Sequence, residues 1–171
     1  LARYLLDTGH TDIRFLVSFD LDAPIAKERI RGFLEAYKAH GITPRDVAIH
    51  RCPHPDYESG YRETQTILDR GVPEAIIAIN DVLALGAKHA VRSLGLNVPQ
   101  DVSVAGYDDV VFASLAEIPL TTVRQNIPEI ARSAVDLLFS EIRDPPVDIR
   151  IPPELVIRSS TATRHGSART L

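Results

Sequence analysis

The sequence predicts an α/β fold in which a parallel β-sheet is covered by helices on both faces. Strand-like and helix-like segments alternate along the 171 residues, which is the order expected when each strand is followed by a crossover helix. The strand-like segments are short, continuous apolar runs, as expected for strands buried on both faces of a sheet. These runs are 13–17, 47–49, 75–79 and 102–105.

Helical periodicity fills the intervals between these strands. Leu1, Leu5 and Leu6 predict a helix that closes near Gly9. Apolar residues at spacings of three and four positions predict four further helices. A glycine follows three of them, as is common where a helix ends. These helices are 24–40 before Gly41, 61–70 before Gly71, 82–94 before Gly95, and 127–142. The segment 147–160 combines proline with alternating apolar residues, which predicts an extended strand.

Composition excludes several classes of protein. Apolar residues make up 44 % and charged residues 25 % of the chain, which is typical of a folded globular domain. No stretch approaches the roughly 20 uncharged residues of a transmembrane helix, so we expect no contact with a membrane. The net charge of −4 disfavours direct binding to a phosphate backbone. The single cysteine, Cys52, excludes an internal disulfide.

Two pairs of polar residues follow predicted strands, at the sheet edge where ligands bind in open α/β sheets. They are Asn80 with Asp81, and Asp108 with Asp109. One member of each pair suffices to cap the next helix. We expect Asp81 and Asp109 to be the caps, which leaves Asn80 and Asp108 available to a ligand.

Arg29 lies in the first two turns of its helix, about 100° from the centre of the apolar face. A solvated surface arginine and a donor to ligand oxygens are both consistent with that position. His50, Cys52 and His54 alternate like metal ligands, but Pro53 and Pro55 disfavour regular strand geometry there. The sequence therefore predicts no metal site, no cofactor and no catalytic residue, and hence no enzyme.

Three motifs identify a family resemblance. They are N-D-V-L-A-L-G-A at 80–87, G-L-N-V-P-Q-D-V-S-V-A-G-Y-D-D at 95–109 and P-L-T-T-V-R-Q at 119–125. In this order and spacing they resemble the effector-binding part of the lactose-repressor (LacI/GalR) family of bacterial transcription regulators. T-G-H at 8–10, R-I-R-G-F at 29–33 and E-S-G-Y at 58–61 support the resemblance, which extends from Leu1 to about Thr161.

The resemblance implies a two-lobed fold like that of type I periplasmic binding proteins, with the second lobe complete and the first lobe partial. Residues 1–18 would finish the first lobe, and 22–122 would form the second. A helix at 127–143 would return to the first lobe, 147–161 would be a crossover strand, and 162–171 would be a flexible tail. The helix-turn-helix and the first strands of the first lobe are missing from the pattern, so DNA binding would belong to the parent protein.

The resemblance also implies effector contacts and a subunit interface. Carried over by motif, the effector contacts are Arg29, Asn80, Asp108 and Gln125. Pro55 replaces an aromatic ring that many members carry, so His54 or Tyr57 would have to substitute for it. The apolar loop 23–25 favours a sugar or sugar derivative as the effector. The implied assembly is a cytoplasmic homodimer through Val82, Leu85, Phe112, Leu115 and Ala116, and the alternative is a periplasmic sugar-binding protein of the same fold.

Overall fold

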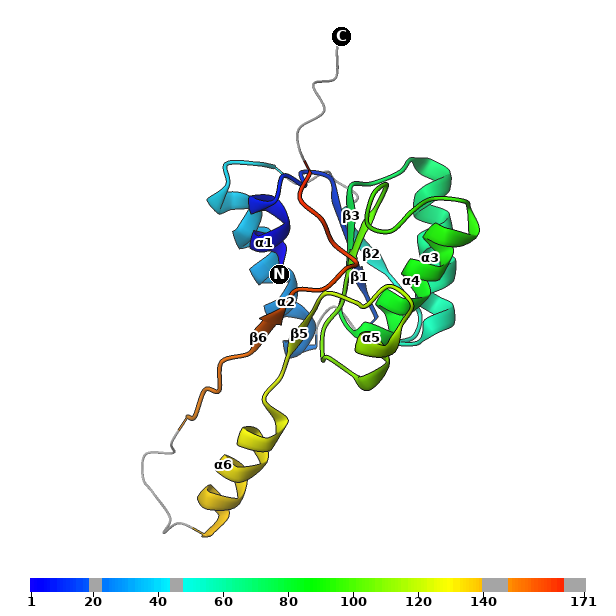
Figure 1. The fold of residues 1–171 in the computed structure, drawn as a ribbon. Helices are drawn as coiled ribbons and strands as arrows, with labels where there is room; N and C mark the ends of the chain where they lie inside the picture. Colours follow the sequence, from blue (N-terminus) through cyan, green and yellow to red (C-terminus); the bar gives the residue numbers. More distant parts are fainter. Residues whose placement is uncertain (19–22, 44–47, 140–147, 165–171) are drawn as a thin grey trace.

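The core of the protein is a parallel sheet between two pairs of helices. The computed structural model describes residues 1–18, 23–43, 48–139 and 148–164. Its main sheet has four strands in the order β2-β1-β3-β4, all parallel (Figure 1). The strands are β1 (Ile13–Val17), β2 (Ile49–Arg51), β3 (Ala75–Ala78) and β4 (Ser103–Ala105). The predicted α/β class is therefore confirmed, and residue 47 of the run expected at 47–49 lies outside the described part of the chain.

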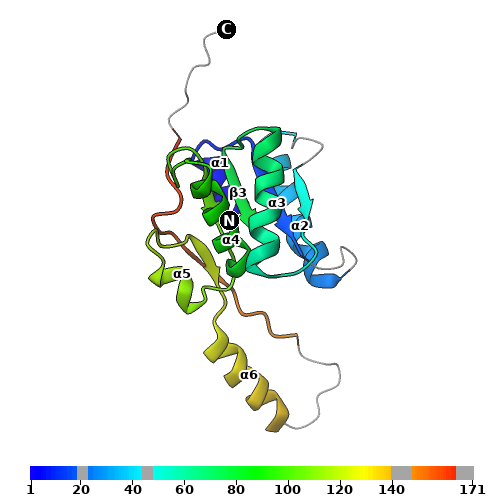
Figure 2. The ribbon, with the colours of Figure 1, turned by 90° about the vertical axis from the view of Figure 1, so that its right-hand side faces the viewer.

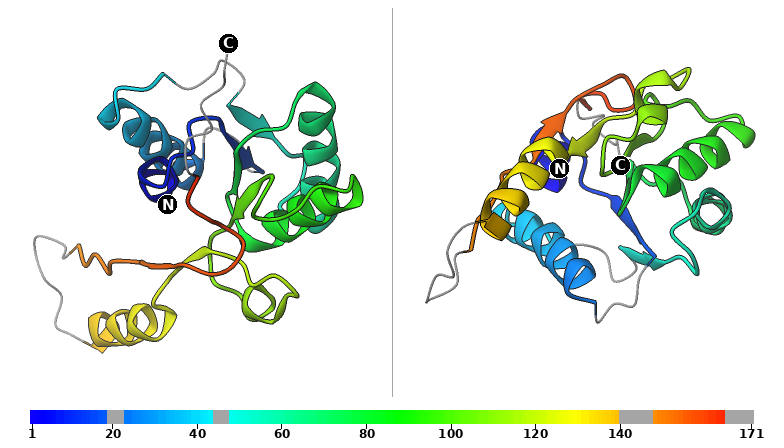
Figure 3. Two further views of the ribbon diagram at one scale, coloured as in Figure 1. Left: turned by 45° about the horizontal axis from the view of Figure 1, so that its top comes forward. Right: turned by 90° about the horizontal axis from the view of Figure 1, so that it is seen from below.

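Helices cover both faces of this sheet. On one face α1 (Ala2–Asp7) packs with α2 (Pro24–Ala39), and on the other α3 (Tyr57–Arg70) packs with α4 (Asp81–Ser93) (Figure 3). All residues of β1, β3 and β4 are buried, which explains why these segments read as continuous apolar runs. None of the helices in the described residues is long and apolar enough to cross a lipid bilayer.

The helices α3 and α4 approach each other at two glycines. A Cβ atom built on Gly60 would lie 2.3 Å from the Leu83 carbonyl oxygen, and one built on Gly86 would lie 2.1 Å from the Tyr57 carbonyl oxygen. Since those atoms belong to the backbone, neither can move aside without moving its helix. The two glycines therefore set the distance between α3 and α4.

The chain after β4 stays attached to this body through Ala113 and Thr122, which are fully buried, and then leads into an arm. After the short α5 (Val111–Leu115), β5 (Thr122–Arg124) leads into α6 (Ile127–Phe139), and β6 (Glu154–Val156) returns antiparallel to β5. Figures 1 and 2 show α6 projecting away from the sheet and its covering helices. No residue of α6 is buried, although the helix is strongly amphipathic.

The expected boundary after residue 18 is corrected by the position of β1. This strand lies in the middle of the sheet, paired with β2 through Phe15–Ile49 and with β3 through Phe15–Ile77. A segment that pairs with both neighbours cannot belong to a lobe separate from them, so 1–18 is part of the same body as 49–105. The helix α1 agrees, since it packs against α2.

The end of the described chain also differs from the expected flexible tail at 162–171. The Arg164 amide donates to the Thr8 carbonyl at 2.8 Å, and the Thr161 hydroxyl is hydrogen-bonded to the hydroxyls of Tyr4 and Thr121. Residues 161–164 are thus held against the body. Residues 165–171 lie outside the described part of the chain.

Candidate functional site

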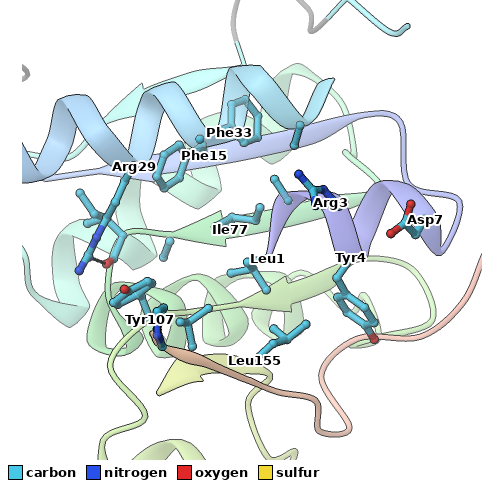
Figure 4. A pocket seen from close by; sticks show the side chains of 17 residues that line it. Leu1, Arg3, Tyr4, Asp7, Phe15, Arg29, Phe33, Ile77, Tyr107 and Leu155 are labelled. Atoms are coloured by element: carbon cyan, nitrogen blue, oxygen red, sulfur yellow. Dashed lines mark hydrogen bonds between the residues drawn. The ribbon is translucent and has the colours of Figure 1, made fainter. Parts of the chain in front are cut away.

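Arg29 extends from the first turns of α2 towards the carboxyl ends of β3 and β4. Its Nη1 donates to the carbonyl of Ile79, and its guanidinium carbon lies 3.7 Å from the centre of the Tyr107 ring (Figure 4). This cation–π contact orients a planar donor group without neutralising its charge. Within the described ranges no carboxylate pairs with Arg29, so further N–H groups are available to ligand oxygens.

Asp108 directly follows Tyr107, and its backbone has an unusual conformation. Its φ is 110° and that of Asp109 is 54°, both in the region that side-chain-bearing residues rarely adopt. The Asp108 amide donates to the Val123 carbonyl at 2.9 Å, and its Oδ1 accepts from Gln125 Nε2 at 2.7 Å. The structure therefore brings Asp108 and Gln125 into contact, as a carboxylate acceptor beside an amide donor.

Asp109 is not the helix cap that the sequence analysis expected. The N-cap of α5 is Val110, which makes no side-chain capping bond. Asp109 instead forms ion pairs at 2.6 Å with Arg124 of β5 and with Arg158, which follows β6. Burial alone would raise the pKa of Asp109, but hydrogen bonds from the two arginines lower it below its usual value. The role of Asp109 depends on ion pairs with residues distant in the chain, which the local sequence does not indicate.

Asp81 is not the cap of α4 that the sequence analysis expected, and the effector contact expected of Asn80 stays a prediction. Asn80 caps α4, because its Oδ1 accepts from the Leu83 amide at 2.8 Å, and its Nδ2 donates to the Pro55 carbonyl at 3.2 Å. Asp81 is completely buried and accepts from the Val110 amide at 2.8 Å and the Thr122 hydroxyl at 2.5 Å. Burial raises the pKa of Asp81 to about 6.

The other predicted cleft residues lie in the loop before α3 and at the first position of that helix. His54, Pro55 and Tyr57 are all exposed. Pro55 meets Asn80 through its carbonyl, as described above, whereas the Tyr57 hydroxyl lies 2.5 Å from Nδ1 of His89 on α4. Tyr57 therefore contacts α4 in this structure, and its part in ligand binding stays a prediction.

The alternating His50, Cys52 and His54 do not assemble a reactive centre. His50 Nδ1 lies 3.0 Å from Glu63 Oε1, and burial, reinforced by the charges of Glu63 and Asp56, raises the pKa of the Cys52 thiol to about 12. A thiol with that pKa stays protonated at neutral pH and is a poor nucleophile. In the part of the chain that the structure describes, no three His, Cys, Asp or Glu side chains are placed to hold a metal ion.

A cavity of about 690 Å³ opens between α1, α2, β3 and β6. Figure 4 shows Leu1 and Tyr4 on one side of it and Arg29 and Tyr107 at one end. Of the four predicted effector residues only Arg29 lines this cavity. Tyr107 also lines the cavity, and it is the residue that precedes Asp108 in the chain.

The predicted interface residues lie on the outer surface of α4 and α5. Phe112 and Leu115 are 71 % and 73 % exposed, and Val82 is 38 % exposed, while Leu85 and Ala116 are partly covered. Val111 was not predicted, although it is 69 % exposed and lies four residues before Leu115 on the same helix. Figure 2 shows α4 and α5 on the same side of the molecule.

Sequence reasoning did not predict the contact of Tyr107 with Arg29, the role of Thr122 or the burial of Asp81. Tyr107 precedes Asp108 in the same loop. An aromatic residue next to a candidate ligand-binding residue could have suggested that Tyr107 belongs to the site. Thr122 and Asp81 lie 41 positions apart, so nothing local connects them.

Comparison with known proteins assigns this chain to a family. The sequence family described as periplasmic binding protein-like domain matches residues 2–161. The HTH-type transcriptional regulator DegA of Bacillus subtilis is 39 % identical over 165 residues, which is 94 % of this chain and 48 % of that protein. The chain thus spans about half the length of such relatives.

Solved structures agree with this match. A sugar-binding transcriptional regulator of the LacI family from Escherichia coli, complexed with phosphate, superimposes with a TM-score of 0.83 at 28 % identity, covering 95 % of this chain and 59 % of that one. The lac repressor dimer bound to operator and an anti-inducer gives a TM-score of 0.83 at 32 % identity, covering 94 % and 57 %. The chain belongs to the periplasmic binding protein-like domain family, in the form found in LacI-family transcriptional regulators.

Proposed function

We propose that this chain is the effector-binding part of a transcriptional regulator, and that it binds a small hydroxyl-rich molecule at the carboxyl ends of β1, β3 and β4. The observation that carries the proposal is the grouping of Arg29 on Tyr107 with Asp108 on Gln125. The two pairs are linked through the adjacent residues Tyr107 and Asp108, which follow β4 at the sheet edge where ligands bind in open α/β sheets.

The chemistry of this group suits a sugar or sugar derivative. Asp108 accepts hydrogen bonds, Gln125 both donates and accepts, and Arg29 donates through a fixed fork. Adjacent hydroxyl groups of a sugar can satisfy donors and acceptors of this kind at the same time. The similarity to a regulator described as sugar-binding supports the same class of ligand.

Coupling to DNA would operate through the arm. Gln125 and Arg124 lie at the end of β5, and both contact the Asp108–Asp109 loop. A ligand that contacts Asp108 differently in two arrangements of body and arm would shift the population between them. The operator-bound lac repressor supports a DNA-binding segment in the parent protein as the recipient of that shift.

The parent protein would act as a homodimer. Large apolar side chains are exposed at Val111, Phe112 and Leu115 on α5 and at Val82 on α4, and the two helices lie on the same side of the molecule (Figure 2). Such a surface favours association, and a self-complementary patch is what a two-fold dimer uses.

The test is a thermal-shift screen of sugars, sugar phosphates and nucleosides on the full-length protein, followed by calorimetry of any stabilising compound. We expect Arg29→Ala and Asp108→Ala each to weaken binding about 100-fold or more, because loss of a charged partner typically costs a few kcal/mol. Arg31→Ala is the matched control, since Arg31 is an exposed residue of the same helix paired with Glu28 and Glu35.

Near-native affinity in both Arg29→Ala and Asp108→Ala would refute the assignment of the site. An equal loss of affinity in Arg31→Ala would show that the effect arises from altered charge on α2 and not from contact with the ligand.

A further inference from the structure

Asp81 lies directly behind the loop that carries Asp108. Its side chain is completely buried, and both of its carboxylate oxygens are used, one by the Val110 amide and one by the Thr122 hydroxyl. Helix capping, the ordinary task of an aspartate at this position, is performed by Asn80. The burial of a carboxyl group therefore serves another purpose.

Asp81 is hydrogen-bonded to the residue before Asp108 and to the residue after Asp109. Before them, the Asp81 amide donates to the Tyr107 carbonyl at 2.8 Å. After them, the Val110 amide donates to Asp81 Oδ2 at 2.8 Å. The two residues between these bonds are the ones with positive φ. A short segment held at both ends cannot relax to an extended conformation, so these bonds maintain the left-handed backbone.

The packing leaves no room for another side chain at this point. A Cβ atom added to Gly106 would lie 2.3 Å from Asp81 Oδ1 and 3.0 Å from Asp81 Cα. The Thr122 hydroxyl donates to Asp81 Oδ1, and its oxygen lies 3.4 Å from the Asp109 amide nitrogen. The carboxyl group thus joins the loop to β5 as well as to α4.

We propose that Asp81 is the positioning residue of this site: it holds residues 106–110 in the conformation that directs Asp108 towards Gln125. The proposal rests on the proposed role of Asp108 in effector binding. Asp81 itself touches no ligand in this arrangement, since its oxygens are occupied within the protein.

The ionisation of Asp81 supplies a second readout, which reports on its carboxyl group. Asp108 and Asp109 face it from the loop and disfavour its charge, while Arg124 of β5 and Arg158 after β6 are paired with Asp109. Burial, the main cause, raises the pKa of Asp81 from 3.8 to about 6. When the loop opens, the carboxyl group regains water and its ordinary pKa.

The sign of the pH dependence follows from that difference. A group whose pKa is higher in the closed state stabilises that state at low pH, and the stabilisation is lost as the pH rises through about 6. Closure of the loop should therefore weaken by about tenfold between pH 5 and pH 8. We expect this pH dependence in the loop that Asp81 contacts and not in β1.

Hydrogen–deuterium exchange of the full-length protein, without ligand, tests this proposal. The readout is the protection of a peptide spanning 106–112 relative to one spanning β1, corrected for the intrinsic pH dependence of exchange. In Asp81→Ala we expect the 106–112 peptide to lose at least tenfold more protection than the β1 peptide, because Val110 loses its acceptor.

Asp81→Asn supplies the rescue. Its amide can accept from Val110 and donate to Thr122 without a charge, so protection at pH 8 should match or exceed that of the unmodified protein and should not change between pH 5 and pH 8. Asp69→Asn, at an exposed position of α3, is the control for loss of a carboxylate. If Asp81→Ala does not fold, Thr122→Val should show the selective loss in the loop.

Three results would overturn the proposal: equal loss of protection in the loop and in β1 for Asp81→Ala or Thr122→Val, damage in Asp81→Asn equal to that in Asp81→Ala, or no pH dependence in the unmodified protein. Since no ligand is added, failure of the sugar screen would leave this measurement unaffected. Selective loss in the loop would support Asp81 even if the effector were not a sugar.

Discussion

The body and the arm of this molecule contain helices that look alike in sequence but differ in what covers them. In α4, eight of the residues are buried, among them Leu83, Ala87 and Val91, whereas α6 buries none. Yet α6 carries Ile130, Leu137 and Leu138 in an amphipathic pattern, with exposures of 40 %, 40 % and 77 %. Periodicity predicts that a helix will form and which face is apolar, but it does not say whether the covering surface lies in the same stretch of chain.

The helix α5 is intermediate between α4 and α6 in how much of its surface the rest of the chain covers. It belongs to the body, and Ala113 anchors it with no exposed area, while Phe112 and Leu115 face outwards. We propose that α5 is covered by a second subunit and α6 by other parts of the parent chain. Three substitutions test the contrast.

Gly86→Val should have the largest effect, because it strikes the contact that holds α3 against α4. A Cβ at this position would meet the Tyr57 carbonyl oxygen at 2.1 Å and the Tyr61 amide nitrogen at 2.9 Å. We expect the free energy of unfolding to fall by about 3 kcal/mol in urea denaturation. Gly32→Ala on α2, where nothing lies within 4 Å, should instead be neutral or stabilising by up to about 1 kcal/mol. Equal losses in the two variants would contradict the proposed contact.

Leu115→Lys should have an intermediate effect, seen in assembly and not in folding. A lysine placed in an apolar interface must be desolvated without a partner, so we expect the full-length protein to sediment as a monomer at micromolar concentration. Val72→Lys, at a 52 % exposed position before β3, should leave the dimer intact. A dimer that survives Leu115→Lys would remove α5 from the interface.

Leu138→Ser should have the smallest effect in the 171-residue chain, because the side chain is 77 % exposed there. We expect a change in the free energy of unfolding of less than about 0.5 kcal/mol. In the full-length protein the same change should cost about 2 kcal/mol if the apolar face of α6 is covered. Equal, small values in both proteins would show that α6 is uncovered in the parent as well.

Most of the secondary structure could be predicted from the sequence, and the reasons are local. Buried strands gave continuous apolar runs, and Gly41, Gly71 and Gly95, each with positive φ, follow the ends of their helices. The position of β1 could not be predicted in this way, because a strand carries no local mark of its neighbours. The resemblance to a two-lobed family suggested a boundary at residue 18 that strand pairing overrules.

The candidate site was predicted with less success in detail. The effector contacts expected of Arg29, Asn80, Asp108 and Gln125 stay predictions. The expected caps were wrong, because Asn80 caps α4 in place of Asp81, and Asp109 forms ion pairs. Asparagine and aspartate are both good helix caps, so composition cannot choose between them. The choice depends on Thr122, Arg124 and Arg158, which are distant in the chain and meet the two aspartates only in the folded protein.

The positive φ angles at Asp108 and Asp109 restrict the mutations that these two positions can accept. Glycine, asparagine and aspartate tolerate such a backbone, whereas β-branched residues strain it. A library randomised at position 109 and selected only for a folded protein should therefore retain glycine and asparagine and lose valine and isoleucine. Altered ligand preference in this family of variants would accordingly have to come from Arg29, Gln125 and Tyr107, where the backbone leaves the choice of side chain open.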